Sequence, residues 1–157
     1  MCRKPVTGAT LGIGAETMAI RELSQPTMPE AGAAPVNLLV VEDEALVASY
    51  IRDVLEESGF VVSGVASSGP EALSLASEGA IDLALVDIKL AGPMDGIEVA
   101  RLLNERFEVR SIFLSGLYDA DTMERAKVAK PLGFLQKPFR PSQVFNALEK
   151  AIAETGR

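Results

Sequence analysis

The chain of 157 residues contains no histidine and no tryptophan, and it has a single cysteine, Cys2. The absence of histidine excludes a histidine general base, a Ser-His-Asp triad and histidine-ligated zinc. A lone cysteine cannot form an internal disulfide, so we expect the protein to work in the reducing cytoplasm.

Long apolar runs and positive charge are also scarce. No apolar run approaches the roughly 20 residues that a membrane-spanning helix needs, and the N-terminus lacks the continuous apolar stretch of a secretory signal. The 15 basic residues are outnumbered by 22 acidic ones, which gives a net charge of -7. This acidity argues against direct binding to nucleic acid. We therefore expect neither a membrane nor a nucleic acid as partner.

Residues 1–36 differ from the rest of the chain. Their acidic and basic residues balance, and three prolines between residues 25 and 35 favour a linker. Residues 15–23 could form a short helix, but we expect much of this extension to be mobile. The folded domain is expected to span residues 37–155.

Strand and helix patterns alternate regularly within that domain. The expected strands cover 38–41, 60–66, 81–86, 111–114 and 134–136. The expected helices cover about 46–55, 68–77, 95–105, 120–129 and a final segment from Pro141. Five strands alternating with five helices predict a doubly wound α/β fold, with a parallel sheet and helices on both faces.

Polar residues stand where four of these apolar strands end. They are Glu42 and Asp43, Asp87, Ser115, and Lys137 followed by Pro138. The carboxyl ends of parallel strands meet at one crevice, where ligands bind in open α/β sheets. The sequence thus predicts a pocket with three carboxylates, one hydroxyl and one ammonium group.

This set of side chains suits the phosphorylation of a carboxylate. Three carboxylates held together repel one another unless a cation lies among them, and an oxygen-rich site favours Mg²⁺. Asp87 ends the central strand and can serve as the nucleophile, since carboxylates form aspartyl phosphates. Lys137 and Ser115 can then contact the phosphoryl oxygens.

Five short motifs carry a resemblance to a known family. They are Val-Val-Glu-Asp-Glu (40–44), Leu-Val-Asp-Ile-Lys-Leu (85–90), Asp-Gly-Ile-Glu (95–98), Phe-Leu-Ser-Gly (113–116) and Phe-Leu-Gln-Lys-Pro-Phe (134–139). With these motifs in order, residues 37–154 resemble the response-regulator receiver domain of two-component signalling. The resemblance implies a flavodoxin-like, five-stranded sheet with strand order 2-1-3-4-5.

The resemblance also implies a role for each pocket residue. Asp87 would be the phosphoacceptor, and Ser115 and Lys137 would bind the phosphoryl group. The implied Mg²⁺ ligands are Glu42, Asp43, Asp87 and the backbone carbonyl of Lys89. A cis peptide between Lys137 and Pro138 is implied as well.

A narrower resemblance concerns residues 113–118, Phe-Leu-Ser-Gly-Leu-Tyr. They are similar to the Phe-Ala-Thr-Gly-hydrophobic-Tyr signature of the FAT GUY regulators, with Leu in place of Ala and Ser in place of Thr. In that subgroup Tyr118 would share or replace the switching role that ordinary receivers give to the aromatic at Phe134.

The resulting expectation is a single-domain response regulator rather than an enzyme. It would take its phosphoryl group from a histidine kinase or a phosphotransfer protein. Its output would pass through protein contacts on the face formed by helix 120–129, strand 134–136 and the final helix. Alternatively, it would act as a phosphate sink.

Two other readings stay open at this point. The domain could be a receiver-like binding module that works without phosphorylation. The glycine-rich stretch Thr7–Gly14 could also suggest a nicotinamide-dependent dehydrogenase fragment. However, no buried strand precedes that stretch, and neither Tyr50 nor Tyr118 has a lysine four residues later.

Overall fold

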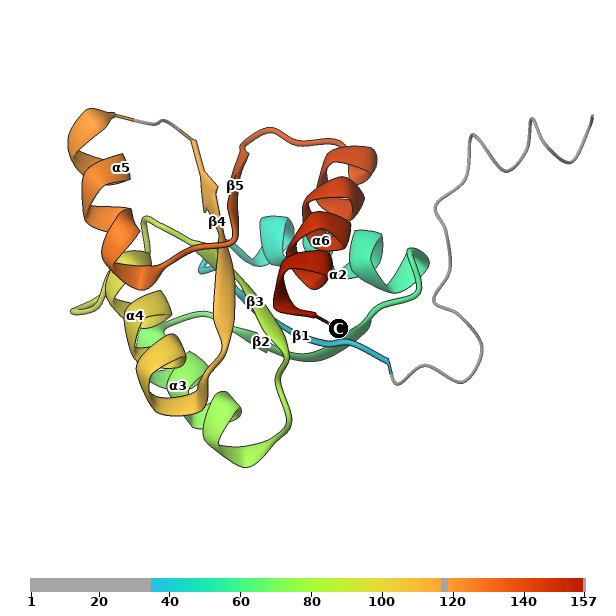
Figure 1. Cartoon of the computed structure of the whole chain (residues 1–157), viewed down its shortest axis with the longest axis horizontal. Helices are drawn as coiled ribbons and strands as arrows, with labels where there is room; N and C mark the ends of the chain where they lie inside the picture. The colour runs from blue at the N-terminus through green and yellow to red at the C-terminus, as the bar shows by residue number, and fades with distance from the viewer. Residues whose placement is uncertain (1–34, 117–118, 157) are drawn as a thin grey trace, which may run out of the picture.

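The computed structural model describes residues 35–116 and 119–156, and within them strands and helices alternate along the chain (Figure 1). The strands are β1 (Asn37–Val41), β2 (Val61–Ala66), β3 (Leu83–Asp87), β4 (Arg110–Ser115) and β5 (Gly133–Gln136). The helices are α2 (Ala45–Glu57), α3 (Gly69–Glu78), α4 (Gly96–Phe107), α5 (Ala120–Ala126), the 3₁₀ turn η1 (Lys127–Ala129) and α6 (Pro141–Thr155).

The strands form one parallel sheet in the order β2-β1-β3-β4-β5, as the resemblance implied. In the register of the sheet, Val41 at the end of β1 lies beside Val86 of β3. Asp87 lies beside Leu114, one residue before the end of β4. The polar residues that follow these positions therefore meet at one edge of the sheet.

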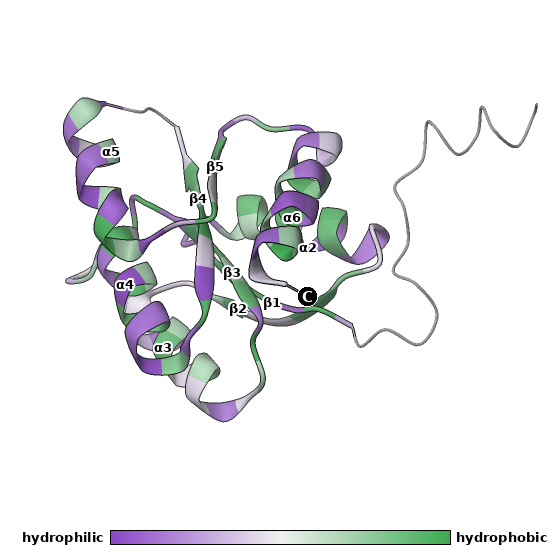
Figure 2. Ribbon diagram, in the orientation of Figure 1, coloured by the Kyte–Doolittle hydropathy of each residue, from purple (hydrophilic) through white to green (hydrophobic). Residues whose placement is uncertain are grey.

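Alternating side chains of the central strands divide the core into two layers. Leu38, Val40 and Leu85 point toward α2 and α6, whose buried residues share their cluster. Leu39 and Val86 belong to the opposite cluster, with residues of α3, α4 and α5. Such strands, apolar on both faces, are typical of a parallel sheet covered by helices on either side. Figure 2 shows the polar faces of these helices turned outward.

Local features of the sequence set the ends of several helices. Ser68 caps α3 by accepting a hydrogen bond from the Glu71 amide at 3.3 Å. Gly59 follows α2 with a positive φ of 92°, a conformation that glycine adopts without a Cβ penalty. Pro141 opens α6, where a missing amide hydrogen costs nothing.

The helix expected over 120–129 differs from the observed one. Regular α-helix ends at Ala126, and one 3₁₀ turn continues to Ala129. Lys130 then takes a left-handed conformation, with φ of 51°. Pro131 explains this ending, because a proline disfavours α-helical geometry in the residue before it.

Two further expectations concern the N-terminal extension and membrane-spanning helices. Residues 1–34 lie outside the described part of the structure, so the expected N-terminal extension stays a prediction. Within the described residues, no helix has the length and apolar character needed to cross a bilayer.

Candidate functional site

Three carboxylates gather at the carboxyl edge of the sheet. Glu42 directly follows β1, Asp43 comes next, and Asp87 ends β3. One carboxylate oxygen from each lies within 4.8 Å of the others. Glu42 and Asp87 are 1% and 6% exposed, whereas Asp43 is more open to solvent. The structure therefore brings the three predicted carboxylates together.

Lys137 lies among these acids, on the segment that follows β5. Its Nζ donates to Glu42 Oε1 at 2.7 Å and to Asp87 Oδ2 at 3.1 Å. One ammonium against three carboxylates leaves an excess of negative charge. An oxygen-rich cluster of this kind suits a hard divalent cation, so the residues present fit Mg²⁺.

Burial and hydrogen bonding both shift the pKa values of Glu42 and Lys137. Burial raises the pKa of the Glu42 carboxyl above its ordinary value, although hydrogen bonds from Lys137 and the Glu44 amide oppose the rise. Burial also disfavours the charged form of Lys137, but the hydrogen bond to Glu42 and the charge of Asp87 outweigh it. The pKa of Lys137 is therefore raised. The ammonium stays charged and offsets part of the repulsion between the acids.

Replacing Lys137 with methionine should destabilise the protein and make its stability depend more strongly on Mg²⁺ than that of the parent. Two buried carboxylates would lose their shared cation. Breaking a fully buried pair costs about 3 to 5 kcal/mol, and we expect about 2 kcal/mol here because Lys137 is 21% exposed. Urea unfolding without and with Mg²⁺ measures this difference. Lys150→Met, at an exposed lysine of α6, is the control. Equal loss in both variants would contradict the expectation.

Backbone amides hold one oxygen of each carboxylate. The Ala91 amide donates to Asp43 Oδ2 at 3.0 Å, the Lys89 amide to Asp87 Oδ1 at 3.2 Å, and the Glu44 amide to Glu42 Oε2 at 3.1 Å. The Lys89 backbone thus borders the pocket. Sequence reasoning missed the contact of Ala91, because every residue except proline has a backbone amide and no residue type announces it.

Ser115 closes β4 and is buried. Its carbonyl accepts a hydrogen bond from the Lys137 amide at 2.7 Å. The peptide between Lys137 and Pro138 is cis, as the resemblance implied. The hydroxyl residue and the lysine are therefore linked through their backbones at the same edge of the sheet.

Of the two aromatic residues predicted as switches, the structure describes Phe134 but not Tyr118. Phe134 in β5 is partly buried and packs on Phe113, with ring centroids 5.7 Å apart and planes inclined by 31°. Tyr118 lies outside the described residues. A switching role for either residue stays a prediction.

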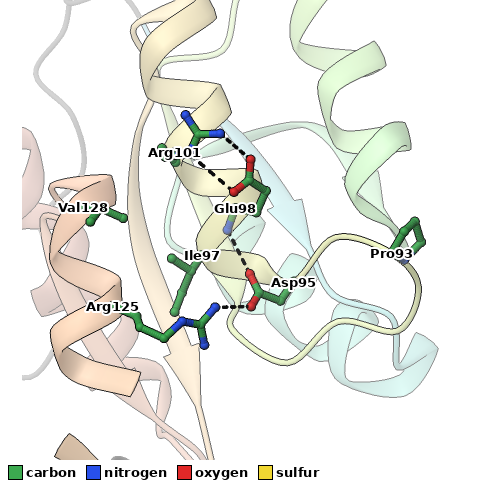
Figure 3. A pocket seen from close by; sticks show the side chains of 7 residues that line it. All are labelled: Pro93, Asp95, Ile97, Glu98, Arg101, Arg125 and Val128. Atoms are coloured by element: carbon green, nitrogen blue, oxygen red, sulfur yellow. Dashed lines mark hydrogen bonds and ion pairs between the residues drawn. The ribbon is translucent and has the colours of Figure 1, made fainter. Parts of the chain in front are cut away.

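Asp95 lies in a separate hollow of about 530 Å³ between α4 and α5 (Figure 3). Asp95 and Glu98, three positions apart, predict a capping pair at the start of α4. Oδ1 of Asp95 accepts from the Glu98 amide at 2.9 Å, which makes Asp95 the N-cap of α4. Its Oδ2 accepts from Arg125 of α5 at 2.6 Å. Burial opposes ionisation, but the Glu98 amide and Arg125 together lower the pKa of Asp95. The Glu98 carboxylate pairs with Arg101 instead of completing a capping box.

A doubly wound parallel sheet with an acid cluster and a lysine at its carboxyl edge defines a class of α/β proteins that bind ligands at this edge. Comparison with known families is more specific. The response regulator receiver domain matches residues 38–149, and the chain belongs to this family.

Curated relatives agree with this assignment. The chain is 32% identical over 131 residues to the transcriptional regulatory protein PdtaR of Mycobacterium tuberculosis (strain ATCC 25618 / H37Rv), covering 83% of this chain and 63% of PdtaR. It is 34% identical over 117 residues to the phyllosphere-induced regulator PhyR of Methylorubrum extorquens, covering 73% of this chain and 43% of PhyR. The chain thus spans only part of the length of these relatives.

Solved structures agree as well. The signal receiver domain of a modulated diguanylate cyclase from Desulfovibrio desulfuricans G20 matches with a TM-score of 0.75 and 36% identity, covering 78% of this chain and 98% of that one. A CheY-like receiver domain protein from Methanospirillum hungatei JF-1 matches with a TM-score of 0.72 and 22% identity, covering 78% and 98%. The second likeness concerns the fold alone.

Proposed function

We propose that this domain accepts a phosphoryl group on the carboxylate of Asp87 from a histidine kinase or a phosphotransfer protein. The observation that carries the proposal is the convergence of Glu42, Asp43 and Asp87 within 4.8 Å, with the Lys137 ammonium 3.1 Å from Asp87. An acid at a strand end that only faces solvent is stabilised by water and requires neither neighbouring carboxylates nor a lysine. An acid that accepts a phosphoryl group requires both, because a cation held by the carboxylates and the lysine offset the phosphoryl charge.

The transfer exchanges one bond to phosphorus for another. An oxygen of Asp87 attacks the phosphorus of a phosphohistidine, the phosphorus–nitrogen bond breaks, and the leaving imidazole takes up a proton. Lys137 would move with the new charge to a phosphoryl oxygen. Ser115, buried at the end of β4, is proposed to donate its hydroxyl to another.

Mg²⁺ is the proposed cofactor. Glu42, Asp43, Asp87 and the backbone carbonyl of Lys89 would hold it, and the ion would neutralise phosphoryl charge during transfer. Glu42 has one more methylene than aspartate, so we propose that it reaches the ion through water. The domain would assist its own phosphorylation and dephosphorylation without converting an external substrate.

Output is proposed to pass through the face formed by α5, β5 and α6. The phosphoryl group carries a charge of about -1.5 to -2 in place of the single negative charge of the Asp87 carboxylate. This larger charge would draw Ser115 and Lys137 inward and shift the population of that face. Phe134, or Tyr118, would follow as the aromatic switch. The partners there, a role as phosphate sink, and a cytoplasmic location belong to the same proposal.

Removing Mg²⁺ should abolish phosphorylation by a small donor. With acetyl phosphate and Mg²⁺, intact-mass measurement is expected to show one added phosphate. With a chelator in place of Mg²⁺, it is expected to show almost none, because uncompensated acids repel the anionic donor. No phosphate on the Mg²⁺-containing sample would favour a receiver-like module that works without phosphorylation.

A further inference from the structure

The segment that carries Lys137 is held from the side by helix α2. Tyr50 of α2 donates its hydroxyl to the backbone carbonyl of Phe139 at 3.3 Å. The rings of these two residues also pack together, with centroids 6.1 Å apart and planes inclined by 32°. The contact joins positions 89 residues apart in the chain. Tyr50 therefore contacts and restrains the backbone two residues beyond Lys137.

The same segment is held at its other end by the sheet. The Lys137 amide donates to the Ser115 carbonyl at 2.7 Å. Beyond Lys137 the chain leaves β5, and α6 begins only at Pro141. Between these elements neither a sheet ladder nor a helix orders the backbone. The hydroxyl of Tyr50 and the buried ring of Phe139 hold this stretch.

The position of the Lys137 ammonium depends on this backbone. Four methylene groups connect the ammonium to its Cα, and the side chain is 21% exposed. A long flexible side chain loses rotamer freedom when it is fixed between Glu42 and Asp87. A backbone held at both ends limits the positions from which the ammonium can reach the acids.

We infer that Tyr50 is a positioning residue, which holds the Lys137–Phe139 segment so that the lysine ammonium meets the phosphoryl group on Asp87. This inference rests on the proposed phosphoacceptor function. Tyr50 touches neither the acids nor the phosphoryl group in this scheme. Its effect reaches them through Phe139 and Lys137.

The surroundings of Tyr50 support this role over simple core packing. Its side chain is 42% exposed, and Leu46, one turn earlier on the same helix, is 86% exposed. Both border one hollow of about 560 Å³, together with Val47, Lys137, Pro138 and Phe139. A residue at the rim of an open hollow adds little to the core. Its ordered hydroxyl instead constrains the backbone beside the site.

Three variants of the full chain test the inference. Tyr50→Phe removes only the hydroxyl, Tyr50→Leu removes the hydroxyl and the ring, and Leu46→Ala is the control in the same hollow. Each is measured for Mg²⁺ affinity by calorimetry and for beryllofluoride binding by ¹⁹F NMR. Amide hydrogen exchange at Lys137 and Phe139 reports on the segment without any phosphoryl group.

We expect Mg²⁺ affinity to stay within about twofold of the parent in all three variants, because the proposed side-chain ligands lie at the end of β3 and on the two residues just after β1. Beryllofluoride binding should weaken about threefold in Tyr50→Phe, the effect of one net hydrogen bond. It should weaken about tenfold or more in Tyr50→Leu. Exchange at the two amides should accelerate in the same order, and Leu46→Ala should match the parent.

Other results would overturn the inference. Equal losses of Mg²⁺ and beryllofluoride binding would indicate general destabilisation. Unchanged amide exchange in Tyr50→Leu would show that contacts with α2 do not order the segment. Failure of the proposed function looks different. The parent itself would then bind no beryllofluoride, while the exchange measurement would still report whether Tyr50 holds the segment.

Discussion

Asp87→Asn is expected to accept no phosphate from acetyl phosphate in the presence of Mg²⁺. The neutral amide cannot act as the carboxylate nucleophile of an acyl phosphate. Its oxygen can still accept from the Lys137 ammonium, which lies 3.1 Å from Asp87 Oδ2. The change also removes one of the negative charges that disfavour ionised Glu42. The variant should therefore fold normally and lose only its phosphorylation.

Asp53→Asn provides the matched control. Asp53 is an exposed acid of α2, and its replacement makes the same change in charge and shape. Intact mass should show the same phosphate uptake in this control as in the parent. Thermal unfolding of Asp87→Asn should confirm a folded protein. Equal labelling of Asp87→Asn and the parent would show that another residue is the acceptor and would end the proposal.

Gly96→Ala is expected to cause the largest loss of stability. A Cβ at this position would lie 1.9 Å from the backbone oxygen of Asp87 and 2.7 Å from the Cα of Ile88. Backbone atoms cannot yield as the end of a flexible side chain can. The first turn of α4 would have to move away from β3, and the hydrogen bond from the Gly96 amide to the Ile88 carbonyl, 2.8 Å long, would weaken. We expect a loss of about 3 kcal/mol or more.

This loss should lower the melting temperature by about 10 °C and disturb Asp87 directly, because the clash falls on its own peptide group. Phosphate uptake should fall with stability. Gly79→Ala is the control, since a Cβ there would meet nothing within 4 Å and its φ of -140° is ordinary for any residue. That variant should be neutral or slightly stabilised. Similar melting temperatures for the two variants would contradict this account.

Much of the fold follows from local patterns. The continuous apolar run from Leu83 to Val86 predicts a central strand, and the capping role of Asp95 is confirmed by its bond to the Glu98 amide. Boundaries were less accurate. The third strand is predicted over 81–86 and observed over Leu83–Asp87. The capping pair with Glu98 formed only on one side, because Arg101 competes for the Glu98 carboxylate.

The candidate site was predictable to the extent that its chemistry lies in side chains. Glu42, Asp43 and Asp87 stand at strand ends, and the parallel sheet brings their oxygens together. The contacts that orient them were not predictable. The Ala91 amide on Asp43 and the Phe139 carbonyl under Tyr50 are backbone groups, which carry no signature in the sequence.

The sequence by itself determined which elements form, in which order, and which acids and which lysine stand at the strand ends. Hydrophobic periodicity and side-chain chemistry are local properties, so they can be read one segment at a time. Only the tertiary structure decided that the Lys137 ammonium bridges Glu42 and Asp87. It also decided that Tyr50 of α2 contacts the segment that carries Lys137. Those contacts join residues 50 to 95 positions apart. They depend on how the packed layers bring distant backbones and side chains within a few ångströms of one another.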